Sequence, residues 1–551
     1  MEPPMTITGS EVLAQSLRSQ GVDTMFYLMG GPMLETEAAC IELGIRAIDT
    51  RHEQAAALAA HAWARVSRRP GVAMGCSGPG ATNLLTGVAN AFTDCAPLVA
   101  IGGSSPRVFL GMEAFQEVDQ LAVFRPVTKW AARIYDAKRI PDVVATAFRQ
   151  ATTGRPGPVY LDLPGDVLGE KIEEESVVYP AAWRPAPRTL GDPAAVREAI
   201  ALLARAERPV IIAGSGVWWS DGAAALQAFV EAAGIPFYTT PISRGLIAED
   251  HALALLNARS KAFSDADVAL VVGTRFNWVI QFGRPPRFAA DLKVIHVDIN
   301  PGQLGHNRAV DVPIVGDARA VLEQLTAEAR EQLDPKRYAA WVGKLRVLDA
   351  EKGAEQDKAM SMDNTPIHPL RLCKEVRDFL KRDAILIVDG QEILNYGRQA
   401  IPTFLPGHRL NSGAFGCMGV GLPFGIGAKI ARPDAQVVVL HGDGSYGINA
   451  MEIDTAVRHQ IPVVVVISNN GGWTADAPWT RPLPKPGRYL GHTRYDKVAH
   501  ELGAHGEFVE KPHEIRPALE RAYASGKPAV VNVITDDKAR AQTVRFSAYT
   551  T

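Results

Sequence analysis

The stretch that most constrains the fold runs from Val437 to Gly472, because two apolar runs flank a helical pattern within it. The runs VVVL and IPVVVVI predict two buried strands, and the pattern over Ile448–His459 predicts a helix between them. Such a strand–helix–strand unit makes its strands parallel, so the carboxyl ends of both strands open on one edge of the sheet. We therefore expect Asp443, which follows the first strand, to lie near Asn470, which follows the second.

The residues at these two strand ends have the chemistry of a magnesium site. Asp443 offers a carboxylate and Asn470 an amide oxygen, while the neighbouring glycines let the backbone approach closely. Mg²⁺ prefers six oxygen ligands and commonly bridges a protein to a diphosphate. A glycine–aspartate–glycine turn alone is often only a link between strand and helix, but here a pair of asparagines follows the second strand as well. The pattern therefore favours a site for a metal and a diphosphate.

Composition and charge exclude several classes of function. The chain has 551 residues, of which 47% are apolar and 21% charged, typical of a soluble globular protein with about three domains. The formal net charge of −2 provides no basic surface for nucleic acid or a membrane. No apolar run approaches the ~20 residues that span a bilayer. The five cysteines form no CxxC pairs and the first residues lack signal-peptide features, so we expect a cytoplasmic protein with reduced thiols.

The N-terminal third alternates helices with short apolar strands, the pattern of a parallel sheet covered by helices. Two of its strand ends carry unusual residues. Arg51-His52-Glu53 follows IRAIDT and opens a helix, while Gly78-Pro79-Gly80 follows VAMGCS as a tight turn. Glu53 also has a simple explanation, because acids at helix N-termini complement the helix dipole without further function. The local pattern leaves both explanations open.

Two segments together identify the chain as a member of the thiamine-diphosphate enzyme superfamily. The GDG and NN segments resemble its cofactor signature, and CSGPGATNLLTGVANAFTDCAPLVAIGG resembles the pyrimidine-binding domain of the acetolactate synthase branch. The resemblance implies that Asp443, Asn470 and the carbonyl of Gly472 bind Mg²⁺. It also implies that Glu53 is the acid that activates the aminopyrimidine ring of the cofactor by promoting its imino tautomer.

The same resemblance implies further contacts around the cofactor. Met418 takes the position of the wedge that holds the cofactor in its bent conformation, although a core methionine is the ordinary explanation for such a residue. Phe115 and Gln116 take positions that face the substrate; a core side chain and a solvated one are the alternatives. The implied diphosphate contacts are Gly442, Gly444, Ser445 and Asn470.

The middle of the chain repeats the strand–helix pattern and predicts a Rossmann-like layer. Asp298 and Arg275 follow apolar strands, where they can bind a ribose hydroxyl and a phosphate. GTRFNWVIQFG resembles its counterpart in oxalyl-CoA decarboxylases and 2-hydroxyacyl-CoA lyases more than the ARFDDR segment of acetolactate synthases. That resemblance implies ADP or the adenosine of coenzyme A in this domain, with an empty domain or a solvated surface as alternatives. The candidate contacts for CoA and substrate are Arg259, Lys261, Arg398, Arg409 and Trp473.

We predict an α/β protein with three doubly wound parallel-sheet domains. Residues 1–175 form the pyrimidine-binding domain, residues 192–345 the Rossmann-like nucleotide or CoA domain, and residues 365–551 the diphosphate and magnesium domain with a C-terminal tail. In CoA-using relatives such a tail can close over bound CoA; a frayed terminus is equally plausible here. Because the superfamily builds its active sites between two chains, the resemblance implies a homo-oligomer, usually a homotetramer that is a dimer of dimers.

The resemblance favours a lyase that splits a 2-hydroxyacyl-CoA into formyl-CoA and an aldehyde or ketone, or joins them in the reverse carboligation. Two departures bear on the substrate: Phe115-Gln116 stands where oxalyl-CoA decarboxylases carry Tyr-Glu, and residues 390–394 replace the GAN segment of the CoA-using branch. Oxalyl-CoA decarboxylase and an acetolactate synthase-like carboligase are the alternatives within the superfamily. A catalytically silent nucleotide-binding scaffold is the alternative from another class, and the joint presence of Glu53, Asp443 and Asn470 argues against it.

Overall fold

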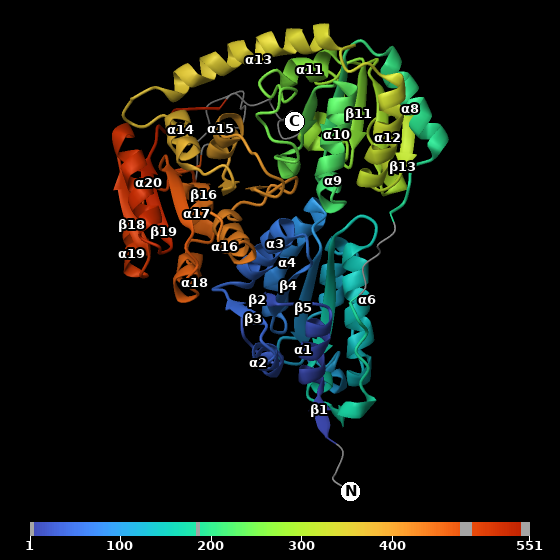
Figure 1. Cartoon of the computed structure of the whole chain (residues 1–551). Helices are drawn as coiled ribbons and strands as arrows, with labels where there is room; N and C mark the ends of the chain where they lie inside the picture. The colour runs from blue at the N-terminus through green and yellow to red at the C-terminus, as the bar shows by residue number, and fades with distance from the viewer. Residues whose placement is uncertain (1–4, 183–187, 474–486, 542–551) are drawn as a thin grey trace. The chain divides into compact units, whose positions relative to one another are not determined.

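The computed structural model describes residues 5–182, 188–473 and 487–541 (Figure 1). Within these residues the strands form three parallel sheets and one short antiparallel pair, so the predicted α/β class is confirmed. The chain divides into two compact units, each described here by itself. Unit 1 comprises residues 1–186, 415–434 and 449–461, and unit 2 comprises residues 187–414, 435–448 and 462–551.

Unit 1 is built on a six-stranded sheet in the order β3-β2-β4-β5-β7-β6, with β3 at one edge. Its strands are rich in buried apolar residues, as expected when helices cover both faces of a parallel sheet. The strands are β2 Thr24–Tyr27, β3 Arg46–Asp49, β4 Gly71–Gly75, β5 Leu98–Ser104, β6 Trp130–Arg133 and β7 Pro158–Pro164; β1 Thr6–Thr8 pairs with β8 Lys171–Glu173. The helices are α1 Gly9–Ser19, α2 Leu34–Glu42, α3 Glu53–Ser67, α4 Pro79–Asp94, α5 Gln120–Phe124, α6 Ile140–Thr152, α7 Gly165–Leu168, α16 Gly421–Ala431 and α18 Glu452–Arg458.

Helix α3 is buried along most of its length because small residues let two other helices approach it closely. A Cβ added at Gly87 of α4 would lie 2.5 Å from the Cβ of Ala57. One added at Gly427 of α16 would lie 2.1 Å from the carbonyl oxygen of Ala59. The alanines of α3 and these two glycines therefore set the spacing of the helix that begins with Glu53.

Gly427→Ala is expected to destabilise the protein by about 1–3 kcal/mol, since the added methyl group overpacks against backbone rather than against a movable side chain. Gly343→Ala is a matched control, because Gly343 lies inside helix α13 and an added Cβ meets nothing within 4 Å. The control should be neutral or stabilising by about 0.5–1 kcal/mol, the helix preference of alanine over glycine. Calorimetric melting temperatures measure both, and equal values for the two variants would contradict the packing argument.

Unit 2 contains two parallel sheets, in the orders β10-β9-β11-β12-β13 and β15-β14-β16-β17-β19-β18. The first comprises β9 Pro209–Ala213, β10 Phe237–Thr239, β11 Val268–Val272, β12 Lys293–Asp298 and β13 Val312–Val315. The second comprises β14 Ile385–Asp389, β15 Arg409–Leu410, β16 Val437–Gly442, β17 Val464–Asn469, β18 His505–Val509 and β19 Ala529–Ile534. The helices are α8 Pro193–Arg205, α9 Ser215–Trp219, α10 Ala223–Ala233, α11 Arg259–Asp265, α12 Ala318–Gln332, α13 Ala339–Met360, α14 Pro369–Phe379, α15 Glu392–Ala400, α17 Asp443–Ile448, α19 Tyr495–Glu501 and α20 Ile515–Ala524.

The predicted strand–helix–strand unit is present, with one more helix than predicted. Strands β16 and β17 are parallel neighbours, as expected. The helix predicted over residues 448–459 is present as α18, which begins at Glu452 and packs in unit 1. Helix α17, which begins at Asp443 and ends at Ile448, comes before it and was not predicted. No helix among the described residues is long and apolar enough to cross a membrane.

Candidate active site

Glu53 is the first residue of α3 and its side chain is held in a sheltered position. His52 caps the helix, its Nδ1 accepting from the backbone amide of Gln54 at 3.1 Å. The carboxylate of Glu53, 4% exposed, accepts a hydrogen bond from Nδ2 of Asn83 at 2.9 Å. A Cβ at Gly80 would lie 3.3 Å from Oε1 of Glu53 and 2.4 Å from Sγ of Cys76, so only glycine fits this turn. Burial and a specific side-chain partner distinguish Glu53 from an acid that merely complements a helix dipole.

Gln116 lies against the same turn, whereas Phe115 points outward. Oε1 of Gln116 accepts from the hydroxyl of Ser77 at 2.5 Å, and a Cβ on Gly78 would lie 2.5 Å from the carbonyl oxygen of Gln116. Gln116 has a φ of 59°, a left-handed backbone that marks a constrained position. Phe115 is 86% exposed. The loop therefore presents a large apolar side chain beside a turn that also contacts Glu53.

Gln120, which the sequence analysis missed, ties this turn to the sheet. Its Oε1 accepts from the amide of Gly78 at 2.8 Å, and its Nε2 donates to the carbonyl of Gly103 and the hydroxyl of Tyr160. The side chain is buried and makes these bonds to three separate segments. Asn83 and His52 were also missed. An amide in a helix and a histidine at its end carry no sequence signal of their own until the helices are packed.

Unit 1 contains a second buried acid, Glu37, to which the sequence assigned no role. Glu37 on α2 is 3% exposed, and among the described residues its Oε1 has no hydrogen-bond partner. Burial raises the pKa of its carboxyl to about 8. At neutral pH the carboxyl of Glu37 is therefore mostly protonated in the folded protein.

Replacing Glu37 with glutamine is expected to flatten the pH dependence of stability. Because the folded pKa of about 8 lies above the ordinary value of 4.5, the folded chain holds a proton that the unfolded chain releases between these values. Stability from this group is therefore complete below about pH 4.5 and falls by roughly 1.4 kcal/mol per pH unit up to about pH 8. Urea midpoints at pH 5.5 and pH 8 should differ less for Glu37→Gln than for the parent. Glu35→Gln, on the exposed side of the same helix, should keep the parental difference; a parental difference in Glu37→Gln would refute the assignment.

The predicted metal ligands converge in unit 2. Asp443 is 2% exposed and, among the described residues, its Oδ2 has no hydrogen-bond partner. One of the two terminal atoms of the Asn470 side-chain amide lies 3.1 Å from Oδ1 of Asp443 and 2.9 Å from the carbonyl oxygen of Gly472. This atom can be either the amide nitrogen or the amide oxygen. If the amide nitrogen of Asn470 occupies this position, it donates to both oxygens; if the amide oxygen occupies it, that oxygen lies about 3 Å from each of the other two. Adjacent oxygens around Mg²⁺, at about 2.1 Å from the ion, are about 3 Å apart, so these residues fit the ion.

Burial raises the pKa of Asp443 to about 7, against the opposing effect of backbone amides including those of Gly444, Gly472 and Asn470. A buried carboxylate without a cation is costly, which is the state that a divalent metal would relieve. Gly472 has a φ of 152°, and an added Cβ would lie 1.9 Å from the carbonyl oxygen of Arg488. Only glycine therefore lets this carbonyl turn toward Asp443.

The predicted diphosphate residues lie at the end of β16 and the start of α17. The hydroxyl of Ser445 donates to the carbonyl of Gly442 at 3.0 Å and lies 3.1 Å from Nδ1 of His441, which is buried beneath it. A Cβ on Gly444 would lie 2.9 Å from two ring atoms of Trp473, so the indole rests directly on this glycine. Trp473 is thus placed against the predicted diphosphate turn. Residues 474–486, which follow Trp473, lie outside the described residues.

Met418 lies in unit 1, in the turn that precedes α16, and its side chain is half-buried. The next residue, Gly419, accepts from Nδ2 of Asn449 at 2.8 Å through its carbonyl oxygen. The turn is thereby tied to the segment between α17 and α18. Its role as a wedge under the cofactor stays a prediction.

Unit 2 also contains a cavity of about 670 Å³ with a strongly cationic lining. Arg244 is paired there with Glu249, its Nε donating to Oε1 at 2.7 Å. Nε of Arg259 and Nε of Arg398 have no hydrogen-bond partner among the described residues. Burial first, and then neighbouring arginines, lower the pKa of Arg259 to about 9 and that of Arg398 to about 10. The charged side chains that line the cavity are Arg244, Arg259, Arg287, Lys352, Arg398 and Arg540, with Glu249 and Glu355.

The other predicted cations lie elsewhere. Lys261 pairs with Asp265 at 3.0 Å on the exposed side of α11 and is not among the lining residues. Arg409 is 1% exposed and donates to the backbone carbonyls of Gly397 at 2.8 Å and Ile401 at 3.3 Å. Neither side chain therefore contributes to the cavity wall. Arg244, Arg287, Lys352 and Arg540 do contribute and were not predicted.

Asp298 and Arg275 lie at the ends of neighbouring strands, as their positions in the sequence predicted. Asp298 ends β12, while Arg275 follows β11, and β11 and β12 pair in parallel. Asp298 is buried, and its Oδ1 accepts from the amide of Asn300 at 2.8 Å. This bond closes a turn and occupies one carboxylate oxygen. Neither residue is among those that line the cavity.

Models of three protein domains match the chain, and all belong to one family. They are the N-terminal TPP binding domain of thiamine pyrophosphate enzymes over residues 7–123, the central domain over residues 196–325 and the C-terminal TPP binding domain over residues 395–533. The chain belongs to the thiamine pyrophosphate (thiamine diphosphate) enzyme family. The predicted superfamily, its three-domain fold and its enzymatic character are thereby confirmed, and thiamine diphosphate is the cofactor that the matched domains bind.

The curated relatives carry several activities. The chain is 38% identical to the acetolactate synthase large subunit IlvG of Mycobacterium tuberculosis over 543 residues, covering 97% of both proteins. It is 35% identical to 2-hydroxyacyl-CoA lyase 1 of Mus musculus over 552 residues, covering 96% of this chain and 94% of the relative. It is 34% identical to oxalyl-CoA decarboxylase of Escherichia coli over 540 residues, covering 96% and 95%. All three relatives belong to the same enzyme family, which supports carbon–carbon bond chemistry for this chain. Their sequence identities are too similar to decide the substrate.

Proposed function

We propose that the protein is a 2-hydroxyacyl-CoA lyase that depends on thiamine diphosphate and Mg²⁺. It would cleave a 2-hydroxyacyl-CoA into formyl-CoA and an aldehyde or ketone, and join them in reverse. The observation that carries the proposal is the cationic cavity of unit 2, where Nε of Arg259 and Nε of Arg398 are buried with no acceptor among the residues that the structure describes. The names of several relatives, 2-hydroxyacyl-CoA lyase and oxalyl-CoA decarboxylase, support a CoA substrate.

The charge of the cavity matches that of CoA. CoA carries a 3′-phosphate in addition to a diphosphate, so it brings more negative charge than a diphosphate alone. Six cationic side chains and two carboxylates line the cavity, and one of the cations is already paired with a carboxylate. The guanidinium group of an arginine can bind two phosphate oxygens through paired hydrogen bonds. A cluster of partly buried cations that outnumber the nearby anions is costly unless an anion binds. We therefore assign Arg259, Arg287 and Arg398 to the phosphates of the CoA moiety.

Each remaining site residue has a defined task in this proposal. Asp443, Asn470 and the carbonyl of Gly472 would hold Mg²⁺, and the turn through Gly444 and Ser445 would hold the diphosphate. When bound, thiamine diphosphate supplies a nucleophilic carbon and an electron sink. Glu53 would share a proton with a ring nitrogen of the aminopyrimidine, a task that suits a sheltered carboxyl held by Asn83.

The substrate itself would bind beside Phe115 and Gln116, with Met418 beneath the cofactor. Overall, the bond between the carbonyl carbon and the carbon bearing the hydroxyl breaks. The hydroxyl proton is released as that oxygen becomes the new carbonyl, and one proton is added to the acyl carbon, which gives formyl-CoA. The side chain of Gln116 is a neutral amide, whereas a glutamate in this position could be negatively charged. Gln116 would therefore orient the hydroxyl without repelling the negative charge that develops on its oxygen.

The test is mass spectrometry of CoA products from the protein loaded with thiamine diphosphate and Mg²⁺. Separate reactions contain a short 2-hydroxyacyl-CoA, oxalyl-CoA or pyruvate, and each is repeated with Glu53→Gln as the background control. Formyl-CoA together with an aldehyde or ketone from the first reaction supports the lyase. Formyl-CoA from oxalyl-CoA alone would make the protein a decarboxylase instead.

A second candidate function is the carboligation of 2-keto acids, favoured by the 38% identity to proteins named acetolactate synthase. It predicts acetolactate from pyruvate in the third reaction and no CoA product in the other two. It also predicts that charge-removing substitutions in the cationic cavity leave the KM for pyruvate unchanged.

Arg259→Gln is expected to raise the KM for the acyl-CoA about 10–100-fold with little change in kcat, because it removes charge-assisted hydrogen bonds to a part of the substrate remote from the reacting carbon. Lys261→Gln is the matched control: it removes a cation from the same helix, α11, at an exposed position paired with Asp265. Its KM should stay within about threefold of the parent, the value of a surface ion pair. Equal effects of the two substitutions would remove the cavity from substrate binding.

We also propose that the protein acts as a homo-oligomer, at least a dimer and by family resemblance a dimer of dimers. Exposed apolar side chains on the loop that carries Phe115, namely Val108, Phe109, Met112 and Val118, are consistent with an interface between copies. Light scattering of the purified protein at micromolar concentration tests this, and a stable monomer would contradict it.

A further inference from the structure

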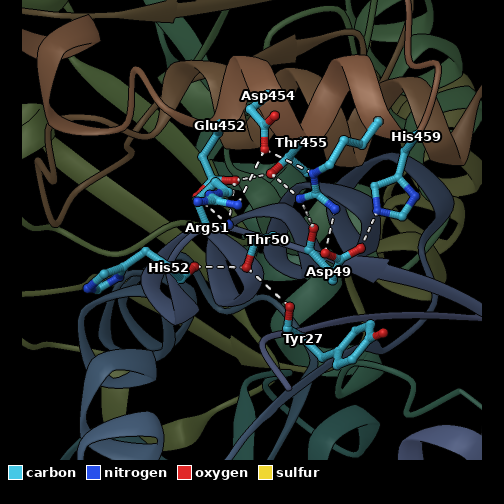
Figure 2. Close-up of polar contacts among 10 residues, drawn as sticks. Tyr27, Asp49, Thr50, Arg51, His52, Glu452, Asp454, Thr455 and His459 are labelled. Atoms are coloured by element: carbon cyan, nitrogen blue, oxygen red, sulfur yellow. Dashed lines mark hydrogen bonds and ion pairs between the residues drawn. The ribbon is translucent and has the colours of Figure 1, made fainter. Parts of the chain in front are cut away.

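The segment that leads into Glu53 is bound by a helix from the other end of the chain. Strand β3 ends at Asp49, and helix α18 begins about four hundred residues later at Glu452. The backbone amide of Arg51 donates to both carboxylate oxygens of Glu452, at 3.1 and 3.2 Å (Figure 2). Strand β3 is at one edge of its sheet, and Arg51 lies two residues beyond the end of that strand.

The carboxylate of Glu452 is built into this position. Glu452 is 1% exposed, and its Oε2 accepts from the hydroxyl of Thr455 at 2.7 Å. Burial raises the pKa of Glu452, opposed by the hydrogen bonds from Thr455 and from the backbone amides of Arg51 and His52. Successive backbone amides that converge on one carboxylate form an anion-binding nest. Loss of the carboxylate would leave buried donors without an acceptor, which is expensive.

A second layer of contacts surrounds this nest. The carboxylate of Asp49 lies 2.7 Å from Nε2 of His459 and accepts a hydrogen bond from Nη1 of Arg458. Nη2 of Arg458 donates to the backbone carbonyl of Asp49 at 3.0 Å. Nη1 of Arg51 lies 3.6 Å from Oδ2 of Asp454. Figure 2 shows Asp454 and His459 on one side of these contacts and Asp49 and Arg51 on the other. These outer pairs are partly exposed, so each contributes little by itself.

The segment is short enough for the position of Glu53 to depend on it. The hydroxyl of Thr50 donates to the carbonyl of His52 at 2.9 Å, and the amide of Thr50 donates to the carbonyl of Tyr27. Between this fixed residue and Glu53 only Arg51 and His52 intervene, and Glu452 holds the amide of Arg51. A shift of this peptide would move the start of α3 and the carboxyl that Asn83 holds.

We infer that Glu452 is a positioning residue, which fixes the backbone before α3 and so places the carboxyl of Glu53 against the cofactor. The inference rests on the proposed role of Glu53. Misplacement of a catalytic group by about 1 Å can cost roughly 100-fold in rate, so a distant carboxylate can act in this way. Glu452 itself touches neither cofactor nor substrate in this assignment.

The test uses Glu452→Gln, which keeps the size of the side chain but turns an amide group toward backbone donors, and Glu452→Asp, which keeps the charge and shortens the side chain. In the cofactor-free protein, hydrogen–deuterium exchange should accelerate in the peptide that contains Arg51 and His52. With thiamine diphosphate and Mg²⁺ bound, exchange of the C2 proton of the thiazolium ring, followed by NMR after acid quench, should slow about tenfold or more. Cofactor affinity should stay within about threefold, because the proposed metal and diphosphate residues are unchanged.

Asp454→Asn is the matched control, since it removes a carboxylate from the same helix that contacts only the outer layer. It should leave C2 proton exchange at the parental rate. The double variant Glu53→Gln/Glu452→Gln should exchange no more slowly than Glu53→Gln alone, because a positioning residue has no effect once its target is disabled. Two outcomes would overturn the inference about Glu452 while leaving the role of Glu53 intact. One is additive slowing of C2 proton exchange in the double variant; the other is exchange at the parental rate in Glu452→Gln when Glu53→Gln exchanges slowly. Parental exchange in Glu53→Gln would overturn the role of Glu53 and the inference with it.

Discussion

Glu53→Gln is expected to leave the protein folded and able to bind thiamine diphosphate while lowering kcat by about 10²–10⁴-fold, the usual contribution of a general acid–base group. Glutamine has nearly the same size and can keep a hydrogen bond with Asn83, so the packing at the start of α3 should survive. It cannot share a proton with the aminopyrimidine ring, and that loss is confined to the chemical step. Steady-state kinetics and cofactor titration by calorimetry measure the two effects separately.

Glu37→Gln is a control for this variant, because it makes the same substitution at another buried acid of unit 1. Its turnover at pH 7 should equal that of the parent. Near-parental kcat in Glu53→Gln would remove Glu53 from the mechanism, whereas loss of cofactor binding in that variant would show that the carboxylate is needed for assembly rather than for catalysis.

Asp443→Ala is expected to weaken Mg²⁺-dependent binding of thiamine diphosphate by about 100-fold or more. Asp443 is the one charged ligand of the proposed set; Asn470 and the carbonyl of Gly472 are neutral and cannot offset the charge of a divalent ion. Calorimetric titration of thiamine diphosphate at several fixed Mg²⁺ concentrations gives the affinity and its dependence on the metal. Unchanged affinity would refute the metal assignment.

The same variant should not destabilise the cofactor-free protein. Burial raises the pKa of Asp443 to about 7, so above neutral pH its carboxylate is a buried charge that backbone amides stabilise only in part. Removal of that charge should leave the melting temperature of the cofactor-free protein unchanged or higher, while abolishing its rise on addition of thiamine diphosphate and Mg²⁺. Asp434→Asn, at an exposed residue ahead of strand β16, should keep the full rise.

The proposed metal site was the part of the candidate active site most open to prediction. Its two side chains follow consecutive parallel strands, and a strand–helix–strand unit brings such residues to one edge of a sheet whatever the rest of the chain does. The runs VVVL and VVVVI could be identified as strands because both faces of the sheet are buried there. Glu53 could be found because it opens a helix within a recognisable motif. The glycine at 472 was named as a ligand, but the reason for it, a φ of 152° beside the backbone of Arg488, appears only in the structure.

Short and edge strands were missed for a physical reason. Strand β15 has two residues and β18, at an edge, reads HGEFV with charged and polar members, so neither has the apolar periodicity that marks a strand. Their pairing is decided by neighbouring strands that the local sequence does not contain.

By itself, the sequence determined the alternation of strands and helices, the class of enzyme and the residues at the ends of consecutive strands, because each of these follows from short-range periodicity or a local motif. Only the tertiary structure decided which cations share a cavity. Arg259 and Arg398 were predicted as contacts for CoA and substrate. The other cations of the cavity come from separate segments and resemble solvated surface residues in sequence; they are Arg244, Arg287, Lys352 and Arg540. It likewise decided that Glu452 holds the backbone before Glu53. A buried carboxylate finds its donors through packing, and packing joins residues that the sequence separates by about four hundred positions.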